Sequence, residues 1–228
     1  MRYNNVLQTV VAAGTVVCAV VSGCGDAGDD CLEEVNLFLD NSAAQGFTAF
    51  LYTDTDVQWV VQMKILDIYS GVYDDCTTED GQFIDLNWHV HVGASDNAQG
   101  VGAECAADAG SPPVGGHYDP TFACSAVTGE LEACAALGRT VDNDYMYMCS
   151  PESYETDPYS CEVGDYSGKF GQLRFEVDAE TESAEVDASG SDRYGPNLEL
   201  INGRSVVFHC GSPRVVCGNL APANDNDE

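Results

Sequence analysis

The sequence predicts an all-β domain, either an antiparallel sandwich or a Greek-key barrel. Short runs of β-branched and aromatic residues recur along the chain, and clusters of Asp, Ser and Gly separate them. One segment, Gly129 to Leu137, has the pattern of a short helix. Several short strands with so little helix are typical of sheets that pack face to face or close into a barrel.

The first 23 residues are predicted to be an export signal. Arg2 supplies an early positive charge, and residues 6–23 form an apolar run that ends in small residues. Polar residues within this run make it a poor membrane span. The segment that ends at Cys24 resembles a bacterial lipoprotein cleavage box, Val-Ser-Gly-Cys. A lipid anchor at Cys24 is therefore one interpretation, and an ordinary cysteine beside a plain cleavage site is the other.

The predicted domain covers residues 31–219. It lies between a short acidic tether, residues 24–30, and a disordered acidic tail, residues 220–228. Its predicted strands, in chain order, are Val35–Leu39, Gly46–Tyr52, Val57–Ile68, Phe83–Val92, Gln172–Val177, Ser205–Cys210 and Val215–Cys217. From Tyr118 to Ser160 the strand signal is weak, and a loop of that length in a compact domain is usually functional or covalently pinned.

The cysteines indicate an oxidising compartment. Of the 11 cysteines, Cys18 lies inside the predicted signal and Cys24 at its edge, which leaves nine for the domain. They are scattered and include no CxxC pair, so disulfides are predicted in preference to a zinc cluster. Because nine is odd, one thiol stays free or Cys24 pairs. We expect the protein to be secreted or periplasmic, or held at the cell surface as a lipoprotein.

The strong acidity of the chain limits its partners. It carries 38 acidic and 8 basic residues, a formal net charge of −30. This charge argues against nucleic acid and anionic membrane surfaces, since both favour Lys and Arg. At physiological ionic strength, screening by salt limits the range over which exposed charges interact to about 8 Å. Charges close to a site are therefore expected to decide how an anionic substrate approaches it.

The four histidines of the chain predict a metal site. His89 and His91 are two residues apart in a predicted strand, so both imidazoles lie on one face and can share an ion. His117 lies in a turn, and His209 ends an apolar strand. A lone histidine is more often a core or surface residue, but this set favours a metal. Four nitrogen donors suit Cu(II). Zinc on four histidines is the alternative, although structural zinc sites usually include thiolates.

Five motifs occur in an order that resembles the copper/zinc superoxide dismutase family. They are His89-Val-His-Val-Gly93, Gly115-Gly-His-Tyr-Asp-Pro120, Cys161 to Gly171, Gly203-Arg-Ser-Val-Val-Phe-His209 and Gly211 to Gly218. The resemblance covers about residues 83–218. It implies an eight-stranded Greek-key β-sandwich or barrel, immunoglobulin-like, with long loops pinned by disulfides.

The resemblance also implies roles for particular residues. The copper ligands, for one copper ion per chain, would be His89, His91, His117 and His209. His117 stands at the position that bridges copper to zinc in the family. Arg214 matches the arginine that attracts superoxide beside copper, and Cys217, three residues later, would pair with Cys105.

The chain departs from the family pattern in ways that resemble its copper-only members. Copper uses all four histidines, Glu162 stands at one zinc position, and Asp165 matches the zinc aspartate as a vestigial zinc position. His209 and Arg214 are nearly adjacent, so the long charged loop between them is missing. We therefore expect zinc to be absent. We also expect Glu162 to accept a hydrogen bond from the nitrogen of His117 that does not face copper.

Two functions fit these features. The first is an exported copper-dependent superoxide dismutase, an oxidoreductase that converts superoxide to dioxygen and hydrogen peroxide as copper alternates between Cu(II) and Cu(I). In that enzyme Arg214 supplies local positive charge, His117 leaves copper on reduction and carries a proton, and Glu162 holds or reprotonates it. The second is a non-catalytic exported copper-binding or cell-surface β-domain of the same fold, which the acidity and the missing loop favour. The ordered motifs weaken a third interpretation, an adhesion-type sandwich with incidental histidines.

Overall fold

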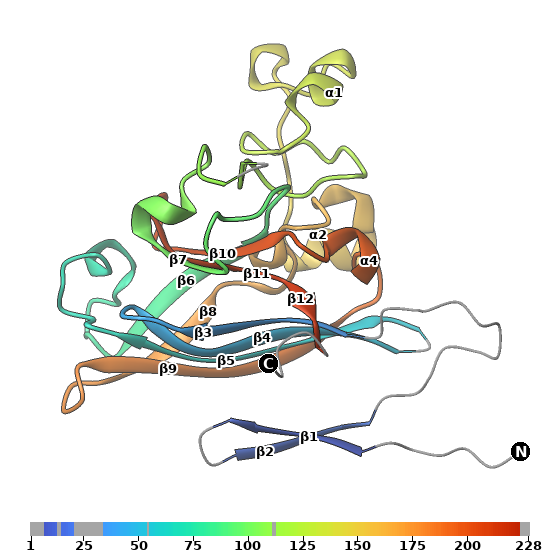
Figure 1. Ribbon diagram of the computed structural model, residues 1–228. Coiled ribbons are helices and arrows are strands. Elements are labelled where there is room, and N and C mark those ends of the chain that lie inside the picture. Colours follow the sequence, from blue (N-terminus) through green and yellow to red (C-terminus); the bar gives the residue numbers. More distant parts are fainter. Residues whose placement is uncertain (1–6, 13–14, 21–33, 54, 111–112, 224–228) are drawn as a thin grey trace, which may run out of the picture.

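The computed structural model describes residues 7–12, 15–20, 34–53, 55–110 and 113–223. The predicted anchor at Cys24, the tether and Cys31 lie outside these residues. Strands β1 (Leu7–Ala12) and β2 (Thr15–Val20) pair with each other as a separate two-stranded sheet (Figure 1). The export role of this segment stays a prediction. Among the described residues, no helix has the length and apolarity needed to cross a membrane.

The domain is an antiparallel sheet of ten strands in the order β12-β3-β4-β5-β9-β8-β6-β10-β11-β7. The strands are β3 (Glu34–Asp40), β4 (Ala44–Tyr52), β5 (Val57–Leu66), β6 (Phe83–Val90), β7 (Gln99–Val101), β8 (Leu173–Asp178), β9 (Ser183–Asp192), β10 (Ser205–His209), β11 (Arg214–Asn219) and β12 (Ala221–Pro222). The sheet curls, so that β3, β4, β5 and β9 form one layer and β6, β10 and β11 cross on its other side (Figure 1).

The strand order confirms the predicted all-β Greek-key fold. Strands β6, β8 and β9 are consecutive neighbours, and β10 returns to lie beside β6, which gives the order β9-β8-β6-β10 of a Greek key. Eight strands have five or more residues, and the two short strands β7 and β12 lie at the sheet edges. All seven predicted strands are present, and the predicted helix is α1 (Leu131–Ala136). Strands β7, β9 and β12 were not predicted.

The core lies between the two layers of the sheet. In β6, every second residue is buried against it, namely Ile84, Leu86, Trp88 and Val90. The Trp88 ring packs against Trp59 from β5 and against Tyr166, with ring centroids 5.1 and 4.7 Å apart. Burying side chains of this size is the main stabilising contribution to such a fold. The alternate residues of β6 point to the other face, where His89 lies.

The domain extends past the predicted boundary at residue 219. Leu220 is buried, and β12 pairs with Val35 and Asn36 of β3. The prediction that a disordered tail begins at residue 220 is therefore wrong, because the apolar Leu220 is buried and the two residues after it close the edge of the sheet beside β3. The last five residues, 224–228, lie outside the described part.

Four disulfides join cysteines of the described chain. They are Cys76–Cys210, Cys105–Cys217, Cys124–Cys134 and Cys149–Cys161. Four such bonds are typical of an oxidising, extracellular environment. The first two tie loops to the ends of β10 and β11. The other two lie in the segment of residues 117–161, here called the lobe, which rises from the sheet and carries α1 at its tip (Figure 1).

Three short helices cover the remaining loops. They are α2 (Pro151–Thr156), α3 (Tyr166–Phe170) and α4 (Leu198–Ile201). The α2 helix begins with Ser150, whose side chain accepts a hydrogen bond from the Ser153 amide, and with Pro151 at its first position. The α3 helix begins at Asp165, whose carboxylate accepts from the Gly168 amide. This cap fixes Asp165 next to the histidines.

Candidate metal centre

Three of the four histidines lie on one face of two neighbouring strands. His209 of β10 pairs across the sheet with Asn87 of β6, two residues before His89. Cross-strand partners share a face of the sheet, as do residues two apart along a strand. His89 and His209 therefore lie on the face that points away from the core. His91 follows two residues after His89, and its amide donates to the Ser205 carbonyl at 2.8 Å, which continues the strand pairing.

His117 comes from the lobe, and backbone hydrogen bonds hold it beside the end of β6. The Tyr118 amide donates to the Val90 carbonyl at 2.9 Å, and the Val90 amide donates to the Gly164 carbonyl at 2.9 Å. A Cβ atom on Gly164 would lie 2.3 Å from the Val90 oxygen and 3.0 Å from the Tyr118 nitrogen. This approach requires glycine. It brings the segment that follows Cys161 directly against His117.

The imidazoles of His89, His91 and His209 form a group that could hold a metal ion. One ligand atom from each lies within 4.8 Å of the other two, and all three residues are buried. His91 Nδ1 lies 2.9 Å from the Gly115 carbonyl oxygen. Because a carbonyl can only accept, Nδ1 carries the proton and Nε2 keeps its lone pair. That Nε2 lies 3.4 Å from Nε2 of His209.

His89 supplies an independent sign of a metal ligand. Its Nδ1 is buried and has no hydrogen-bond partner within the described part of the chain. Buried polar atoms are nearly always satisfied, because an orphaned one costs about 1–3 kcal/mol. An ion bound by this nitrogen together with the nitrogens of His91 and His209 would satisfy it.

Burial keeps the three imidazoles neutral. It lowers the pKa of His89 and of His91 well below the usual value, and the electrostatic interaction with neighbouring His117 lowers both further. Burial also lowers the pKa of His209 to about 3. Neutral imidazole is the form that binds metals. The group is therefore ready to bind an ion at neutral pH without first releasing protons.

His117 lies against this group but contacts a pair of carboxylates. Its ring centroid is 4.0 Å from that of His89 and 5.2 Å from that of His91. Its Nδ1 lies 2.7 Å from Glu162 Oε2, and Glu162 is fully buried. His117, Glu162 and Asp165 form a second group whose ligand atoms lie within 4.8 Å of one another. The structure thus brings all four predicted histidines together, three in one group and His117 in the adjoining one.

Hydrogen bonds from the lobe and from α3 fix both carboxylates. Glu162 Oε1 accepts from the Ser125 amide at 2.8 Å, and Asp165 Oδ1 accepts from the Gly168 amide at 2.7 Å. The Tyr147 hydroxyl donates to Asp165 Oδ2 at 2.8 Å and accepts from the Glu162 amide at 2.9 Å. Burial, and then the charge of Asp165, raise the pKa of the Tyr147 phenol, so it stays a donor. Tyr147 therefore joins the two carboxylates.

Arg214 stands beside His209 and is held by two carbonyls. The two residues are cross-strand partners at an irregularity between β10 and β11. The Arg214 Nη1 donates to the Cys105 carbonyl at 2.8 Å, and Nη2 donates to the Gly115 carbonyl at 2.7 Å. The Gly115 carbonyl is the one that His91 Nδ1 also reaches, so one oxygen positions both the guanidinium and a histidine.

The disulfide that the resemblance implied supports this arrangement. Cys105 and Cys217 are joined, and Cys217 lies three residues after Arg214 in β11. The bond fixes the Cys105 carbonyl that accepts from Arg214. At Gly115 the backbone has φ of +66°, and a Cβ atom would lie 2.5 Å from Val92. A side chain at this position would displace the shared carbonyl.

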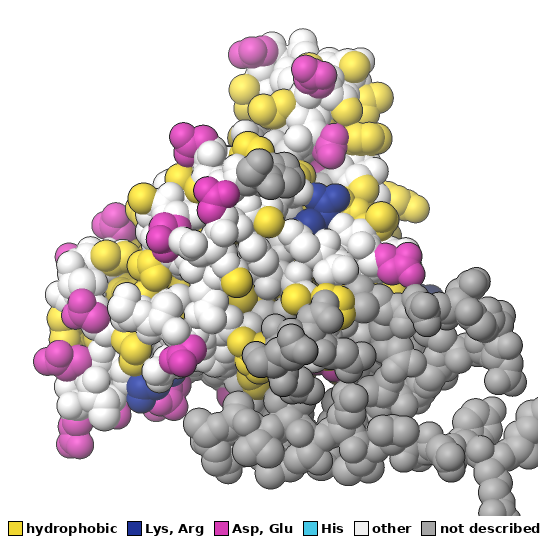
Figure 2. Space-filling view, viewed as in Figure 1, with side chains coloured by type: hydrophobic (Ala, Val, Ile, Leu, Met, Phe, Trp, Pro, Cys, Tyr) yellow, Lys and Arg dark blue, Asp and Glu magenta, His cyan; other side chains and the backbone are white. Residues whose placement is uncertain are grey.

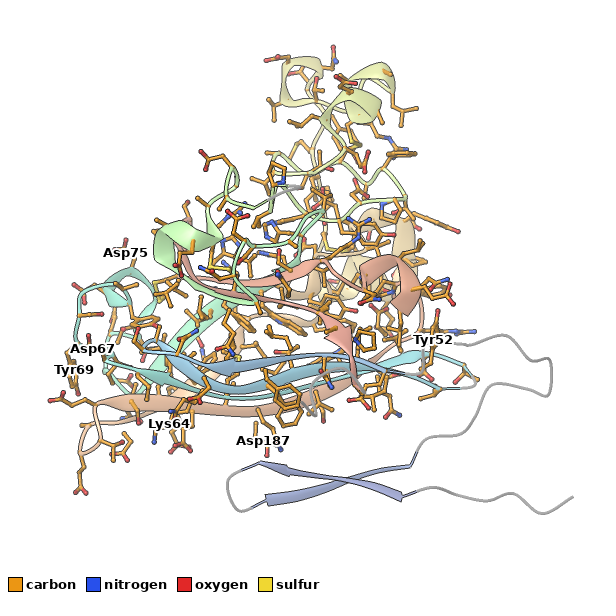
Figure 3. All side chains as sticks on the ribbon, viewed as in Figure 1. Tyr52, Lys64, Asp67, Tyr69, Asp75 and Asp187 are labelled. Carbon is orange, nitrogen blue, oxygen red and sulfur yellow. A yellow bond between two sulfur atoms is a disulfide. The ribbon has the colours of Figure 1, made fainter. Side chains whose placement is uncertain are left out.

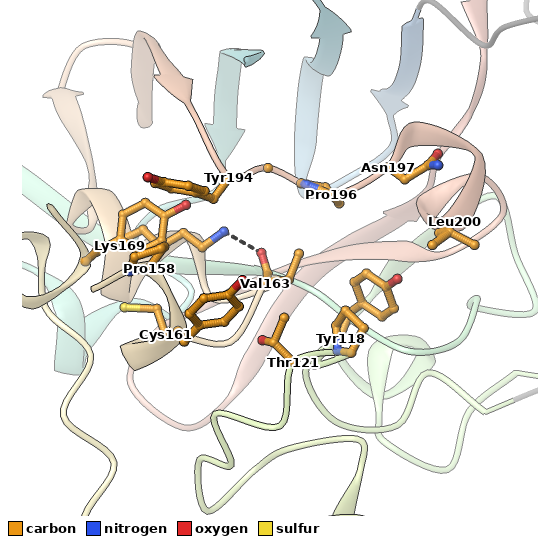
Figure 4. Close-up of a pocket in the computed structure, with 14 residues that line it drawn as sticks. Tyr118, Thr121, Pro158, Cys161, Val163, Lys169, Tyr194, Pro196, Asn197 and Leu200 are labelled. Atoms are coloured by element: carbon orange, nitrogen blue, oxygen red, sulfur yellow. Dashed lines mark hydrogen bonds between the residues drawn. The ribbon is translucent and has the colours of Figure 1, made fainter. Parts of the chain in front are cut away.

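A cavity of about 300 Å³ is lined in part by Cys161 and Val163, the neighbours of Glu162 along the chain (Figure 4). Lys169 of α3 reaches into its wall and donates to the Val163 carbonyl at 2.7 Å and to Asp192 of β9 at 2.8 Å. The Lys169 ammonium also lies over the rings of Tyr154 and Tyr166. This buried ion pair fastens α3, the helix that begins at Asp165, to β9.

Sequence reasoning found the charged and imidazole groups of this site and missed their supports. Tyr147, the Ser125 amide and the Gly115 carbonyl carried no pattern that pointed to a role. Gly115 belongs to the motif Gly115-Gly-His-Tyr-Asp-Pro120, and its glycine pair is the sequence signal that could have pointed to the positive φ found there. Tyr147 lies in the loop for which pinning was predicted, but its partner lies 18 residues away.

Comparison with known proteins gives structural likenesses but no match to a family model or a curated protein. Among solved structures, a similar chain is described as a crystal structure analysis of the clock protein EA4. It is 16% identical, with a TM-score of 0.44 over 87% of this chain and 99% of that chain. A likeness at this level carries no argument about fold or function.

Proposed function

We propose that this protein is an exported copper-dependent superoxide dismutase, most similar to the copper-only members of that family. The observation that carries the proposal is the buried cluster of four histidines in which His117 contacts Glu162 at 2.7 Å. Copper bound there would supply one-electron chemistry by alternating between Cu(II) and Cu(I). Two superoxide ions and two protons would then give dioxygen and hydrogen peroxide.

The donor set supports copper in preference to zinc. Neutral imidazole nitrogens suit Cu(II), which exceeds zinc in affinity for nitrogen ligands. His89, His91 and His209 would hold the ion, with Nε2 of His117 as the fourth donor. The second group, with one imidazole and two carboxylates, is a candidate for zinc. Its carboxylate oxygens, however, already accept hydrogen bonds from amides and from Tyr147.

Arg214 would guide the substrate. Its guanidinium is fixed by two carbonyls beside His209. The chain as a whole repels anions, with its formal net charge of −30. Because attraction grows as distance shrinks, a cation beside the reacting centre outweighs carboxylates that lie beyond the screening length of about 8 Å. Arg214 would therefore bind and orient superoxide at the histidine cluster.

Glu162 would control the proton on His117. A carboxylate accepts from Nδ1–H, which leaves the lone pair on Nε2 for the ion. If His117 leaves the ion during turnover, the same hydrogen bond keeps its ring in place while Nε2 gains a proton. His117 can then give this proton to the reduced substrate. Glu162 would thus orient His117 in place of the zinc ion that does so in the wider family.

Metal analysis and a superoxide assay test the proposal together. The purified protein, loaded with copper and dialysed, should hold one copper per chain and little zinc, and it should remove superoxide in a pulse-radiolysis assay. Zinc at equal occupancy would contradict the copper-only assignment. A protein that holds copper but leaves the decay of superoxide unchanged would be the non-catalytic copper-binding domain, which is the second candidate.

The histidines provide the matched variants. His89→Ala and His209→Ala should lose copper and activity while the β-sheet circular dichroism spectrum is kept, because both side chains lie outside the core between the layers. A spectrum that collapsed together with metal binding would instead assign the histidines a structural role.

A further inference from the structure

Two methionines of the lobe are held on its outer surface in an alternating pattern. Along residues 145–148, Tyr145 and Tyr147 are partly buried, whereas Met146 and Met148 are 72% and 64% exposed. The Tyr145 hydroxyl donates to the Ala123 carbonyl at 2.7 Å, and the Tyr147 hydroxyl donates to Asp165 at 2.8 Å. Because both tyrosines are fastened inward, both methionines point outward on the same side.

The spacing of the two thioethers suits a shared ion. Residues two apart in an extended segment have their Cα atoms about 7 Å apart and their side chains on one face. Methionine has three rotatable bonds beyond its Cα atom, so two sulfurs at this spacing can approach one another. The Cys149–Cys161 disulfide fixes the chain directly after Met148. This bond limits movement of the backbone beside the pair.

The chemistry of a thioether selects the ion. Thioether sulfur is a soft, uncharged ligand that prefers Cu(I), whereas Mg²⁺, Ca²⁺ and Mn²⁺ prefer oxygen. Sulfur also remains available at any pH, since it carries no proton to displace. Two thioethers on an exposed surface give a weak site, which can release its ion to a site with more ligands.

The position of the pair connects it to the histidines. Tyr147, which lies between the two methionines, donates to Asp165 and accepts from the Glu162 amide. Asp165 Oδ1 lies 3.5 Å from His89 Nε2, and Glu162 contacts His117. Tyr147 thus connects the segment that carries the two thioethers to the carboxylates beside the histidine cluster.

We propose that Met146 and Met148 form a surface site for Cu(I) that receives the ion before the histidines do. Its role in loading rests on the proposed copper site, but the binding of Cu(I) by the thioethers does not. The lobe also exposes Leu137 and Val141, and Figure 2 shows apolar side chains gathered there. If this surface served only as an apolar contact for another protein, it would need hydrophobic area but no sulfur. The experiments below therefore test whether the sulfur atoms themselves bind the ion.

The first experiment observes the sulfurs directly. Metal-free protein with ¹³C-labelled methionine methyl groups is titrated with Ag(I), a redox-inert substitute for Cu(I), and then with Cu(I) under anaerobic conditions. The signals of Met146 and Met148 should both shift, while that of the buried Met63 stays as an internal reference. Assignment comes from single Met→Leu variants. Unshifted signals from both exposed methionines would overturn the proposal.

The second experiment measures loading. The variant M146L/M148L keeps apolar side chains of similar size but removes both sulfurs, and M63L is the matched control. Cu(I) is offered from a competing chelator, and its transfer is followed by the absorbance of the chelator complex. The double variant should take up copper more slowly and reach the same final occupancy, while M63L behaves like the parent. Equal loading rates for the double variant and the parent would exclude a role in uptake.

The two experiments separate this proposal from the proposed function. If the parent shows methionine shifts but the histidine variants H89A and H209A bind as much copper as the parent, the histidine centre is wrong and the thioether site stands. If the histidines determine final copper occupancy and the methionine signals do not respond, the histidine centre stands and the thioether site is wrong.

Discussion

The Glu162 carboxylate contacts groups from two different parts of the chain. Its Oε2 meets His117 and its Oε1 accepts from the Ser125 amide, while the residue itself is fully buried. A buried charge is stable only when hydrogen bonds or ion pairs compensate it. The structure supplies one partner for each oxygen of the Glu162 carboxylate. A substitution at Glu162 therefore tests these two hydrogen bonds directly.

Replacing Glu162 by Gln should keep the shape and remove the charge. We expect copper to remain bound and the rate of superoxide removal to fall by roughly 10–100-fold, the usual effect of losing a group that orients a metal ligand. The loss should grow at high pH, where protons are scarce. Pulse radiolysis across a pH series measures this, with Glu132→Gln on the exposed face of α1 as the control. Parental rates at every pH would remove Glu162 from the mechanism.

Arg214 can be tested by separating its charge from its geometry. Arg214→Gln removes the charge, and Arg214→Lys keeps the charge but cannot reach both carbonyls with the same planar fork. Both variants should react more slowly with superoxide, and the Gln variant should also lose the decrease in rate with added salt. Arg174→Gln, which changes the net charge equally at an exposed side chain, should match the parent. A slow Arg174 variant would point to overall charge instead.

At the scale of elements, the strands that were predicted from sequence are those with enough apolar or β-branched residues to show a pattern. The missed strand β9 has the sequence SAEVDASGSD, rich in acidic and small residues. It forms because all ten of its residues pair with β5, from Val57–Asp192 to Leu66–Ser183. Such long-range pairing is not encoded in local propensity. The role of Tyr147 was missed for the same reason, since its partner comes from another segment.

The Cys105–Cys217 disulfide should contribute more stability than the Cys124–Cys134 disulfide. With Cys76–Cys210 intact, the shortest covalent loop that it closes has roughly 36 residues, against about 10 for Cys124–Cys134. The chain-entropy relation then predicts a difference of about 1 kcal/mol. Urea unfolding of the metal-free double Ser variants of each pair would measure it. An equal loss for both pairs would show that local packing decides the effect.

The Cys105→Ser/Cys217→Ser variant has a second expected effect. The released Cys105 carbonyl should hold the Arg214 guanidinium less firmly, so that superoxide removal slows while copper occupancy is kept. Measuring both quantities on the same preparation distinguishes this from simple loss of metal.

At the scale of the whole molecule, acidic side chains project from the sheet and its loops. Asp67, Asp75 and Asp187 extend away from the ribbon on different sides (Figure 3). The neutral histidines are enclosed while this charge stays in water. The folded state therefore excludes protons from His89, His91 and His209, whereas the unfolded chain would bind protons there at mildly acidic pH.

This difference predicts how the stability of the metal-free protein depends on pH. The folded pKa of His209 is about 3, against about 6.5 when unfolded. Its stabilising contribution is present above pH 6.5 and is lost as the pH falls towards 3, because only the unfolded chain gains the proton. Between pH 6.5 and 5 the free energy of unfolding should fall by up to about 1.4 kcal/mol per pH unit from His209 alone.

Urea unfolding at several pH values checks this expectation. His89 and His91 should steepen the decrease, since burial lowers the pKa of both. The variant His209→Gln should show a shallower slope. A free energy of unfolding that stays constant between pH 6.5 and 5 would contradict the assignment of buried, neutral histidines.

The Cys76–Cys210 disulfide has a consequence for a protein exposed to proteases. Residues 141–144 of the lobe are all exposed, and loops of this kind are preferred sites of cleavage. A cut there separates Cys124–Cys134 on one side from Cys149–Cys161 on the other, and neither bond is broken. The two fragments would remain joined by Cys76–Cys210 and Cys105–Cys217, with histidines on both. The nicked protein should migrate as one species on a denaturing gel until a thiol reductant splits it in two.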